Sequence, residues 1–219
     1  MDRVLLIPFA AALAVSAAPV HAADTSADGA EPIVITGQQV KYGVRYTSTA
    51  TKTDTDVKDI PQALTTVTSQ QIEDQQLRTI GDLIEYVPGA SYGGGEGNRD
   101  QIVLRGNSST ADFFVNGVRD DVQYFRDFYN IERVEVLKGP DAMIFGRGGG
   151  GGIVNRVLRR PTLTPHRDFT ASADNSGDFR LTGDVDQPLS SILGVRLNAM
   201  VEGGESFRHH TELHRYGFN

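Results

Sequence analysis

The fold of this chain is decided by the stretch ERVEVLKGP at residues 132–140 and the stretch FGRGGGGGIVNRV at residues 145–157. In the first stretch, a short apolar run from Val134 to Leu137 ends at Gly139-Pro140, which is a strong turn signal. In the second stretch, a run of glycines leads directly into residues 152–157, where β-branched residues favour a strand. The two stretches therefore predict two strands joined by a glycine-rich loop.

Composition excludes several classes of protein. The 219 residues include 21 Lys+Arg and 28 Asp+Glu, a formal net charge of −7, so the basic excess of a nucleic-acid binder is missing. The absence of Cys excludes a disulfide framework, a thiolate metal site and a Cys nucleophile. Fifteen of the 24 glycines lie between Gly81 and Gly152, which indicates a region that needs backbone turns more than side chains. The length allows one domain with appendages and a sizeable core.

Residues 1–22 have the pattern of a cleaved signal peptide. Asp2 and Arg3 precede an apolar run, and Val20-His21-Ala22 ends it with the small or apolar residues that signal peptidase accommodates, which places cleavage after Ala22. The run is shorter than the ~20 apolar residues of a spanning helix, and Pro8 interrupts it. The protein is therefore expected to leave the cytoplasm.

Residues 23–59 are expected to form a flexible segment, because their small, acidic and Thr-rich stretches hold too few apolar residues to build a core. The exception is a β-prone island made of Ile33, Val34, Ile35 and Thr36. Two interpretations of this island remain open. It is either a strand that docks back onto the domain or a peptide displayed for strand addition to a partner.

Residues 60–161 predict a compact domain that mixes strands and short helices. Thr68 with Gln71, and Thr79 with Asp82, have the spacing of helix N-terminal caps. Asn116-Gly117 between apolar runs predicts a tight hairpin, because both residues of such a turn take positive φ. The strands expected in this region are 64–68, 101–105, 112–115, 134–137 and 152–157.

Residues 162–219 change to an alternation of apolar and polar residues. Residues 179–186 and 193–202 place apolar side chains on one face and polar side chains on the other, and residues 167–174 alternate more weakly. These segments are about as long as the 9–11 residues that cross a bilayer as a tilted strand, but a half-buried soluble sheet alternates in the same way. The alternation leaves both possibilities open, and the export signal favours the outer membrane.

Motifs for catalysis or metal binding are weak. Gly146 to Gly151 match G-x-G-x-x-G, but a dinucleotide site needs a helix after the glycines and a strand is expected here. His210 and His214 stand four residues apart with Glu212 between them, and ordinary loop histidines are the favoured interpretation; the role of His209 stays open as well. No nucleophile, base and orienting group can be assembled, so we expect no enzyme, no catalytic residue, no bound metal and no cofactor.

Motifs that carry a resemblance stand, in order along the chain, at residues 60–67, 83–89, 102–106, 114–118, 132–140, 145–149, 151–152, 155–157 and 160–161. Together they resemble the plug domain of TonB-dependent outer-membrane receptors, and most closely their ferric-siderophore branch. The resemblance implies an α+β fold, in which a compact mixed-sheet plug with short helices precedes the first antiparallel strands of an incomplete outer-membrane β-barrel. It divides the chain into a signal peptide (1–22), a flexible periplasmic N-terminus (23–59), a plug (60–161) and the start of the barrel (162–219).

The resemblance also implies a function. The chain would be the N-terminal part of a receptor in the cell outer membrane that binds a ferric siderophore, the transported ligand, from outside. It would couple to the inner-membrane energy-coupling protein TonB through a TonB box at Ile33, Val34, Ile35 and Thr36. Candidate ligand-binding residues on the apical loops are Tyr92, Asn98, Arg99, Ser108, Arg119, Tyr124, Phe125 and Arg126. Candidate plug–barrel contacts are Arg105, Glu132, Arg133, Glu135 and Lys138.

The length limits what the chain does alone. A plugged barrel of about 22 strands needs roughly 220 residues for its strands, whereas 58 residues follow Pro161. We therefore expect the opening part of a longer receptor, unable to transport anything by itself. The alternatives are a soluble periplasmic binding or interaction module built on a plug domain, and a receptor for another cargo such as cobalamin or a glycan. The sequence does not identify the siderophore.

Overall fold

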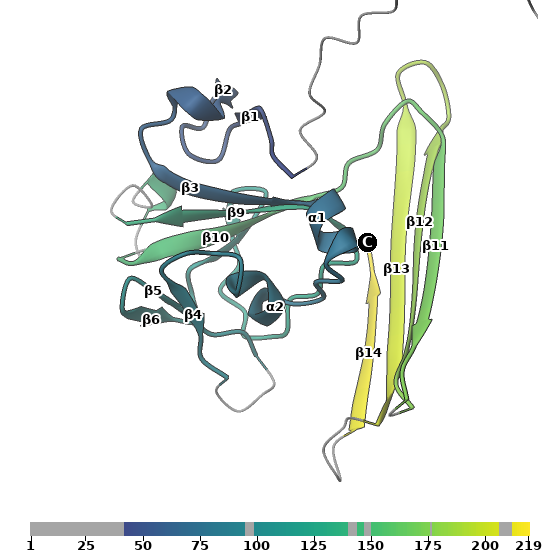
Figure 1. The fold of residues 1–219 in the computed structure, drawn as a ribbon. Coiled ribbons are helices and arrows are strands. Elements are labelled where there is room, and N and C mark those ends of the chain that lie inside the picture. Colours follow the sequence, from purple (N-terminus) through teal and green to yellow (C-terminus); the bar gives the residue numbers. More distant parts are fainter. Residues whose placement is uncertain (1–41, 95–98, 140–143, 147–149, 176, 206–211) are drawn as a thin grey trace, which may run out of the picture. The chain divides into compact units, whose positions relative to one another are not determined.

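The computed structural model describes residues 42–94, 99–139, 144–146, 150–175, 177–205 and 212–219. Short strands and helices occupy the part up to Leu158, and four long strands follow (Figure 1). The fold is α+β, as predicted, with mixed and antiparallel open sheets and few short helices.

A five-stranded mixed sheet forms the centre of the first part. Its strand order is β3-β9-β10-β7-β8, in which β10 runs parallel to β7 and the other neighbours are antiparallel. The Asn116-Gly117 turn between β7 and β8 has φ values of 50° and 80°, which confirms the predicted hairpin. The strand bounds are β3 (Ala63–Thr68), β7 (Phe113–Val115), β8 (Val118–Arg119), β9 (Ile131–Lys138) and β10 (Gly152–Leu158).

Two short helices begin where the caps predict. Helix α1 (Ser69–Asp74) starts after Thr68, whose side chain accepts a hydrogen bond from the Gln71 N–H. Helix α2 (Ile80–Ile84) starts after Thr79, and Thr79 and Asp82 form a reciprocal capping box. A 3-10 turn, η1 (Val57–Asp59), precedes these helices in the chain.

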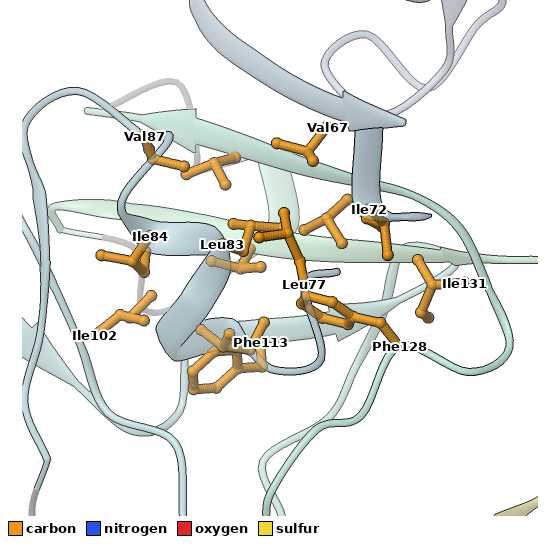
Figure 2. Packing of buried hydrophobic residues seen from close by; sticks show 14 of the residues in the cluster. Val67, Ile72, Leu77, Leu83, Ile84, Val87, Ile102, Phe113, Phe128 and Ile131 are labelled. Carbon is orange, nitrogen blue, oxygen red and sulfur yellow. The ribbon is translucent and has the colours of Figure 1, made fainter. Parts of the chain in front are cut away.

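One face of the five-stranded sheet packs against the two helices and forms the main hydrophobic core (Figure 2). Val67 of β3 and Val134 of β9 meet Ile72 of α1 and Leu83 of α2 there, and Phe113 of β7 is fully buried with them. We call this face of the sheet the helix face.

The opposite face of the sheet is covered by residues 42–60, which we call the N-terminal strap. Strands β1 (Tyr46–Thr47) and β2 (Thr55–Asp56) pair with each other in the strap. Ala50 and Ile60 are buried against Phe114, Leu137 and Ile153 of the sheet. We call this face of the sheet the strap face.

The prediction of a flexible segment is therefore wrong for residues 42–59. The Thr-rich stretch packs mainly through hydroxyl groups and needs few apolar side chains: Thr47 and Thr49 are buried, and both hydroxyls donate to the buried carboxylate of Glu135. The prediction of flexibility considered only the number of apolar residues and therefore did not include such hydrogen bonds.

A small antiparallel sheet, β4-β5-β6, lies beside the glycine-rich loop. Its strands are β4 (Ala90–Tyr92), β5 (Ile102–Leu104) and β6 (Asn107–Ser109), of which only β5 was predicted, because β4 and β6 have three residues each and few apolar side chains. Gly151 packs against the end of β5, where a Cβ would overlap the carbonyl oxygen of Leu104. The glycines before β10 therefore allow close backbone packing.

The second part is a four-stranded antiparallel meander, β11-β12-β13-β14, which confirms the strands predicted from alternation. The bounds are β11 (His166–Ala173), β12 (Phe179–Pro188), β13 (Gly194–Glu205) and β14 (Glu212–Phe218). Strand β14 was not predicted. His214 lies in it, so the interpretation of His214 as a loop histidine is wrong; its side chain is exposed and lies 3.8 Å from Glu212.

Candidate functional site

The four-stranded sheet has two chemically different faces. On one face, the apolar side chains of Leu181, Leu197 and Val201 are 43–48% exposed, and the aromatic rings of Phe169 and Tyr216 are more exposed still. On the other face, polar and charged side chains are almost completely buried: Arg180, Asp184, Asp186, Asn198 and Glu202. A sheet of a soluble protein in water has the opposite arrangement, with apolar side chains inside.

Ion pairs connect the polar face of this sheet to the first part of the chain, residues 42–158, which we call the plug-like part. Arg180 of β12 donates two hydrogen bonds, of 2.8 and 2.6 Å, to the carboxylate of Asp127, and a third of 2.8 Å to Glu202. Arg78, which follows α1, donates to Glu202 at 3.2 Å. Such paired and hydrogen-bonded charges satisfy one another when buried.

A second group of bonds holds the connection between the two parts. Arg159 donates to Asp184 of β12 at 2.7 Å, and Arg196 of β13 donates to the same carboxylate and to the Arg160 carbonyl oxygen. The Thr162 N–H and hydroxyl both donate to Asp186 at 2.8 Å. A cavity of about 400 Å³ lies beside these bonds, lined by residues of the plug-like part and of β11 and β12.

Of the five predicted plug–barrel contacts, Glu132 interacts electrostatically with Arg196 of β13, and the other four lie beside residues of the first part of the chain. Glu135, predicted as a contact of the long strands, is fully buried on the strap face and bonds to Thr47, Thr49 and Arg133. Arg133 donates to Glu132 and Glu135, its neighbours on β9. Lys138 donates to the Pro88 carbonyl oxygen, and the exposed Arg105 side chain lies beside Gly139.

The sequence missed the residues that do contact the long strands. Arg78, Asp127, Arg159, Arg180, Asp184, Arg196, Arg215 and Glu202 carry these contacts. A usable signal was present in β12 and β13, since Arg180, Asp184 and Glu202 occupy the polar positions of the alternation. No local pattern marks Arg78 or Asp127, which lie in connections.

Arg126, predicted as a ligand-binding residue, is the centre of a buried network, and its guanidinium faces protein groups in this structure. Its side chain is 0% exposed, stacks on the Phe113 ring at 3.9 Å, and donates to Asp120 and to the carbonyl oxygens of Tyr124 and Val122. Its backbone N–H donates to Asp100. The network therefore joins the loop at 120–126 to residue 100.

Other predicted ligand residues lie at accessible places around this network. Tyr124 is 37% exposed and its hydroxyl donates to Asp120; Arg119 is half-buried beside Phe114 and donates to Asp121. Ser108 is exposed and accepts from Gln101. Tyr92 and Phe125 line a common open pocket of about 730 Å³ next to α2. The Tyr92 hydroxyl lies 3.5 Å from the Arg99 carbonyl oxygen.

Electrostatics keeps these phenols neutral. Burial raises the pKa of both Tyr92 and Tyr124, and the carboxylate of Asp100 raises the pKa of Tyr92 further. The pKa of Asp100 is itself raised by burial, although Arg126 opposes the shift. A neutral phenol offers a hydrogen bond and an aromatic face. It lacks the negative charge of the phenolate form, so it is a poor ligand for a metal ion.

Several predicted residues lie outside the described residues: Asn98, His209, His210 and the island Ile33, Val34, Ile35 and Thr36. Among the residues that the structure describes, no His, Asp and Glu side chains gather in a group that could hold a metal ion. No helix in the described ranges combines the length and apolarity needed to cross a membrane.

Comparison with known proteins identifies the family of the first part. Residues 56–153 match the family described as "TonB-dependent Receptor Plug Domain". The chain is 30% identical over 220 residues to the "Catecholate siderophore receptor Fiu" of Escherichia coli (strain UTI89), covering 96% of this chain and 29% of the relative. It is 26% identical over 191 residues to the "Ferrichrome outer membrane transporter/phage receptor" of Escherichia coli K12, covering 82% of this chain and 26% of the relative.

Solved structures agree with this similarity. The closed form of the ferric-catecholate import receptor Fiu from Escherichia coli K12 superposes with a TM-score of 0.74 at 29% identity, over 81% of this chain and 26% of that one. The pyoverdine receptor FpvA of Pseudomonas aeruginosa gives a TM-score of 0.73 at 26% identity, over 78% and 26% of the two chains. The chain thus spans between a quarter and a third of these relatives, and its residues 56–153 form a plug domain of the kind found in TonB-dependent receptors.

Proposed function

We propose that this chain is the N-terminal part of an outer-membrane receptor that takes up ferric siderophores with energy from TonB. The observation that carries the proposal is the two-faced sheet β11–β14. Its apolar face is exposed while its charged face is bonded to the plug. This is the arrangement of a membrane barrel wall, with lipid outside and a polar, plugged interior.

The cargo follows from the relatives and from the loops. The similar receptors carry names that refer to catecholates, ferrichrome and pyoverdine, which are chemically diverse iron chelates. Around the loop at 119–125, neutral phenols and the Arg119 guanidinium suit a chelate with aromatic rings and anionic oxygens. Arg99, whose backbone carbonyl oxygen lies 3.5 Å from the Tyr92 hydroxyl, is a further candidate.

Coupling to TonB is assigned to the island Ile33–Thr36, which would pair with TonB by strand addition. Export through cleavage after Ala22 would place this island in the periplasm. Supporting this part of the proposal, the strap begins a few residues after the island and is bonded to the plug sheet through Thr47 and Thr49, so a force on the island would act on the strap first.

The soluble periplasmic module is the weaker alternative. Exposed side chains of Phe169, Leu197, Tyr216 and Phe218 on one face of the sheet would create a large apolar patch in water. The plug-domain match and the names of the relatives likewise favour transport over catalysis.

The test is the Val34→Pro substitution in the receptor that carries these residues, expressed in iron-starved cells. Proline removes a backbone donor from the pairing strand, so uptake of radiolabelled iron should be lost while cell-surface binding persists. The probes are the ferric complexes of 2,3-dihydroxybenzoate, ferrichrome and ferrioxamine. The control is Ala27→Pro, which lies outside the island. Normal uptake by the Val34→Pro receptor would disprove the coupling role.

A further inference from the structure

Two neighbouring residues of β10 contact different segments on opposite faces of the five-stranded sheet. Successive side chains of a strand point to opposite faces of its sheet. Arg156 lies on the helix face, where the loop at 120–126 approaches, and Asn155 lies on the strap face. Both side chains are buried, with 5% and 2% of their surface exposed.

On the helix face, Arg156 is bonded to the loop that the proposed function assigns to the cargo. Its guanidinium donates to the Asp120 carboxylate at 2.6 Å and to the Tyr124 hydroxyl at 2.7 Å. Tyr124 also donates to Asp120, so the three side chains form a closed ring of hydrogen bonds. Any movement of Tyr124 or Asp120 therefore changes the bonds of Arg156.

On the strap face, Asn155 holds the strap. Its Nδ2 donates to the Thr49 hydroxyl at 2.9 Å, and that hydroxyl donates in turn to Glu135. The Asn155 Oδ1 accepts from the Gly117 N–H at 2.9 Å. One amide side chain thus connects the strap with the turn between β7 and β8.

That turn gives the loop a second connection to β10. The Asn116 N–H donates to the Arg156 carbonyl oxygen at 2.8 Å, and the Asn116 side chain accepts from the Leu158 N–H. Strand β8 leads from this turn directly into Asp120. A displacement of the loop consequently reaches Asn155 both through Arg156 and through Gly117.

We propose that β10 is a two-sided relay, in which Asn155 and Arg156 couple the position of the loop at 120–124 to the hold on the strap at Thr47 and Thr49. When cargo draws Tyr124 or Asp120 away from Arg156, the turn and β10 shift together, the Asn155 bond to Thr49 weakens, and the strap is released toward the N-terminus. The cargo-facing role of the loop rests on the proposed function. The coupling itself rests only on the bonds described.

The relay is tested by hydrogen exchange on the full receptor in detergent, without siderophore and without TonB. Asp120→Asn removes the carboxylate charge to which both Arg156 and Arg126 donate. Hydrogen exchange at the strap amides should then accelerate about tenfold; one such amide is the Lys52 N–H, which donates to the Ser48 carbonyl oxygen. Asp121→Asn is the matched control, because Asp121 lies next to it and bonds to Arg119 instead. Tyr124→Phe, a milder change, should act in the same direction.

Asn155→Ala completes a double-mutant cycle. It should loosen the strap by itself, and adding Asp120→Asn should then have no further effect on strap exchange. The relay is overturned if Asp120→Asn matches Asp121→Asn, if its effect persists unchanged beside Asn155→Ala, or if protection falls equally in β9 and the strap. Because no cargo is used, these results are independent of the uptake test with Val34→Pro.

Discussion

At the scale of single residues, burial changes the roles that charge suggests. Glu135 and Arg126 have the chemistry of contact residues, yet both are fully buried and bonded within the plug. Glu135 holds the strap, and Arg126 holds the loop at 120–126 against Phe113. Removing one member of such a buried set leaves the others without partners, which is why these residues stabilise the domain without facing a ligand.

The glycine-rich loop gives a residue-scale prediction about packing. Gly151→Ala should destabilise the plug by about 1–3 kcal/mol, because the new Cβ overlaps the Leu104 carbonyl oxygen, which cannot move without disturbing β5. Gly150→Ala should change stability by no more than about 0.5 kcal/mol, since its nearest neighbour is the flexible Asn107 side chain at 3.7 Å. Hydrogen exchange at the amides of β5 and β10 measures both values. Equal effects of the two substitutions would contradict this explanation.

At the scale of elements, β10 and β13 show two kinds of strand. Strand β10 is buried on both faces, because helices cover one and the strap covers the other, so the adjacent residues Ile153 and Val154 are both apolar and its sequence does not alternate. Strand β13 alternates, with Arg196, Asn198 and Glu202 facing the plug and Leu197 and Val201 exposed. The environment on each face explains the sequence of each strand.

The exposed face of β13 gives an element-scale prediction. Leu197→Arg should lower stability in a lipid bilayer by up to about 2–4 kcal/mol, because it places a charge on the lipid-facing side of a strand. If the same face were in water, the substitution of a 48% exposed leucine should change stability by about 0.5 kcal/mol or less. Urea unfolding of the receptor in lipid vesicles distinguishes the two cases, with Ser191→Arg in the exposed connection as the control.

At the scale of the whole molecule, the described residues form a plug domain and an open four-stranded sheet. The described strands end with β11 and β14 as unpaired edges of a four-stranded sheet. The chain spans 26–29% of the curated relatives compared above. Unpaired edges do not persist in a membrane, where every backbone group needs a partner, so further strands must pair with these edges if the sheet lies in a bilayer.

The share of its relatives that the chain spans gives a whole-molecule prediction. The isolated 219-residue chain should bind ferric siderophores weakly, because the plug loops contribute only part of a site whose remaining contacts we assign to loops of the barrel. Isothermal titration with the ferric complex of 2,3-dihydroxybenzoate should give a dissociation constant at least about 100-fold weaker than that of the full receptor, which corresponds to a loss of about 2.8 kcal/mol of binding free energy at about 1.4 kcal/mol per tenfold. Equal affinity would contradict it.

Local signals determined much of this protein from the sequence alone. Caps at Thr68 and Thr79, the Asn116-Gly117 turn and the alternation after residue 166 act over a few residues, and each predicted element formed where it was expected. Contacts between distant residues were decided only by the tertiary structure. Thr49 meets Glu135 and Asn155, and Asp127 meets Arg180, across separations of 53 to 106 residues, so no local pattern could assign these partners. The tertiary structure buries these polar groups together and pairs them in internal hydrogen bonds.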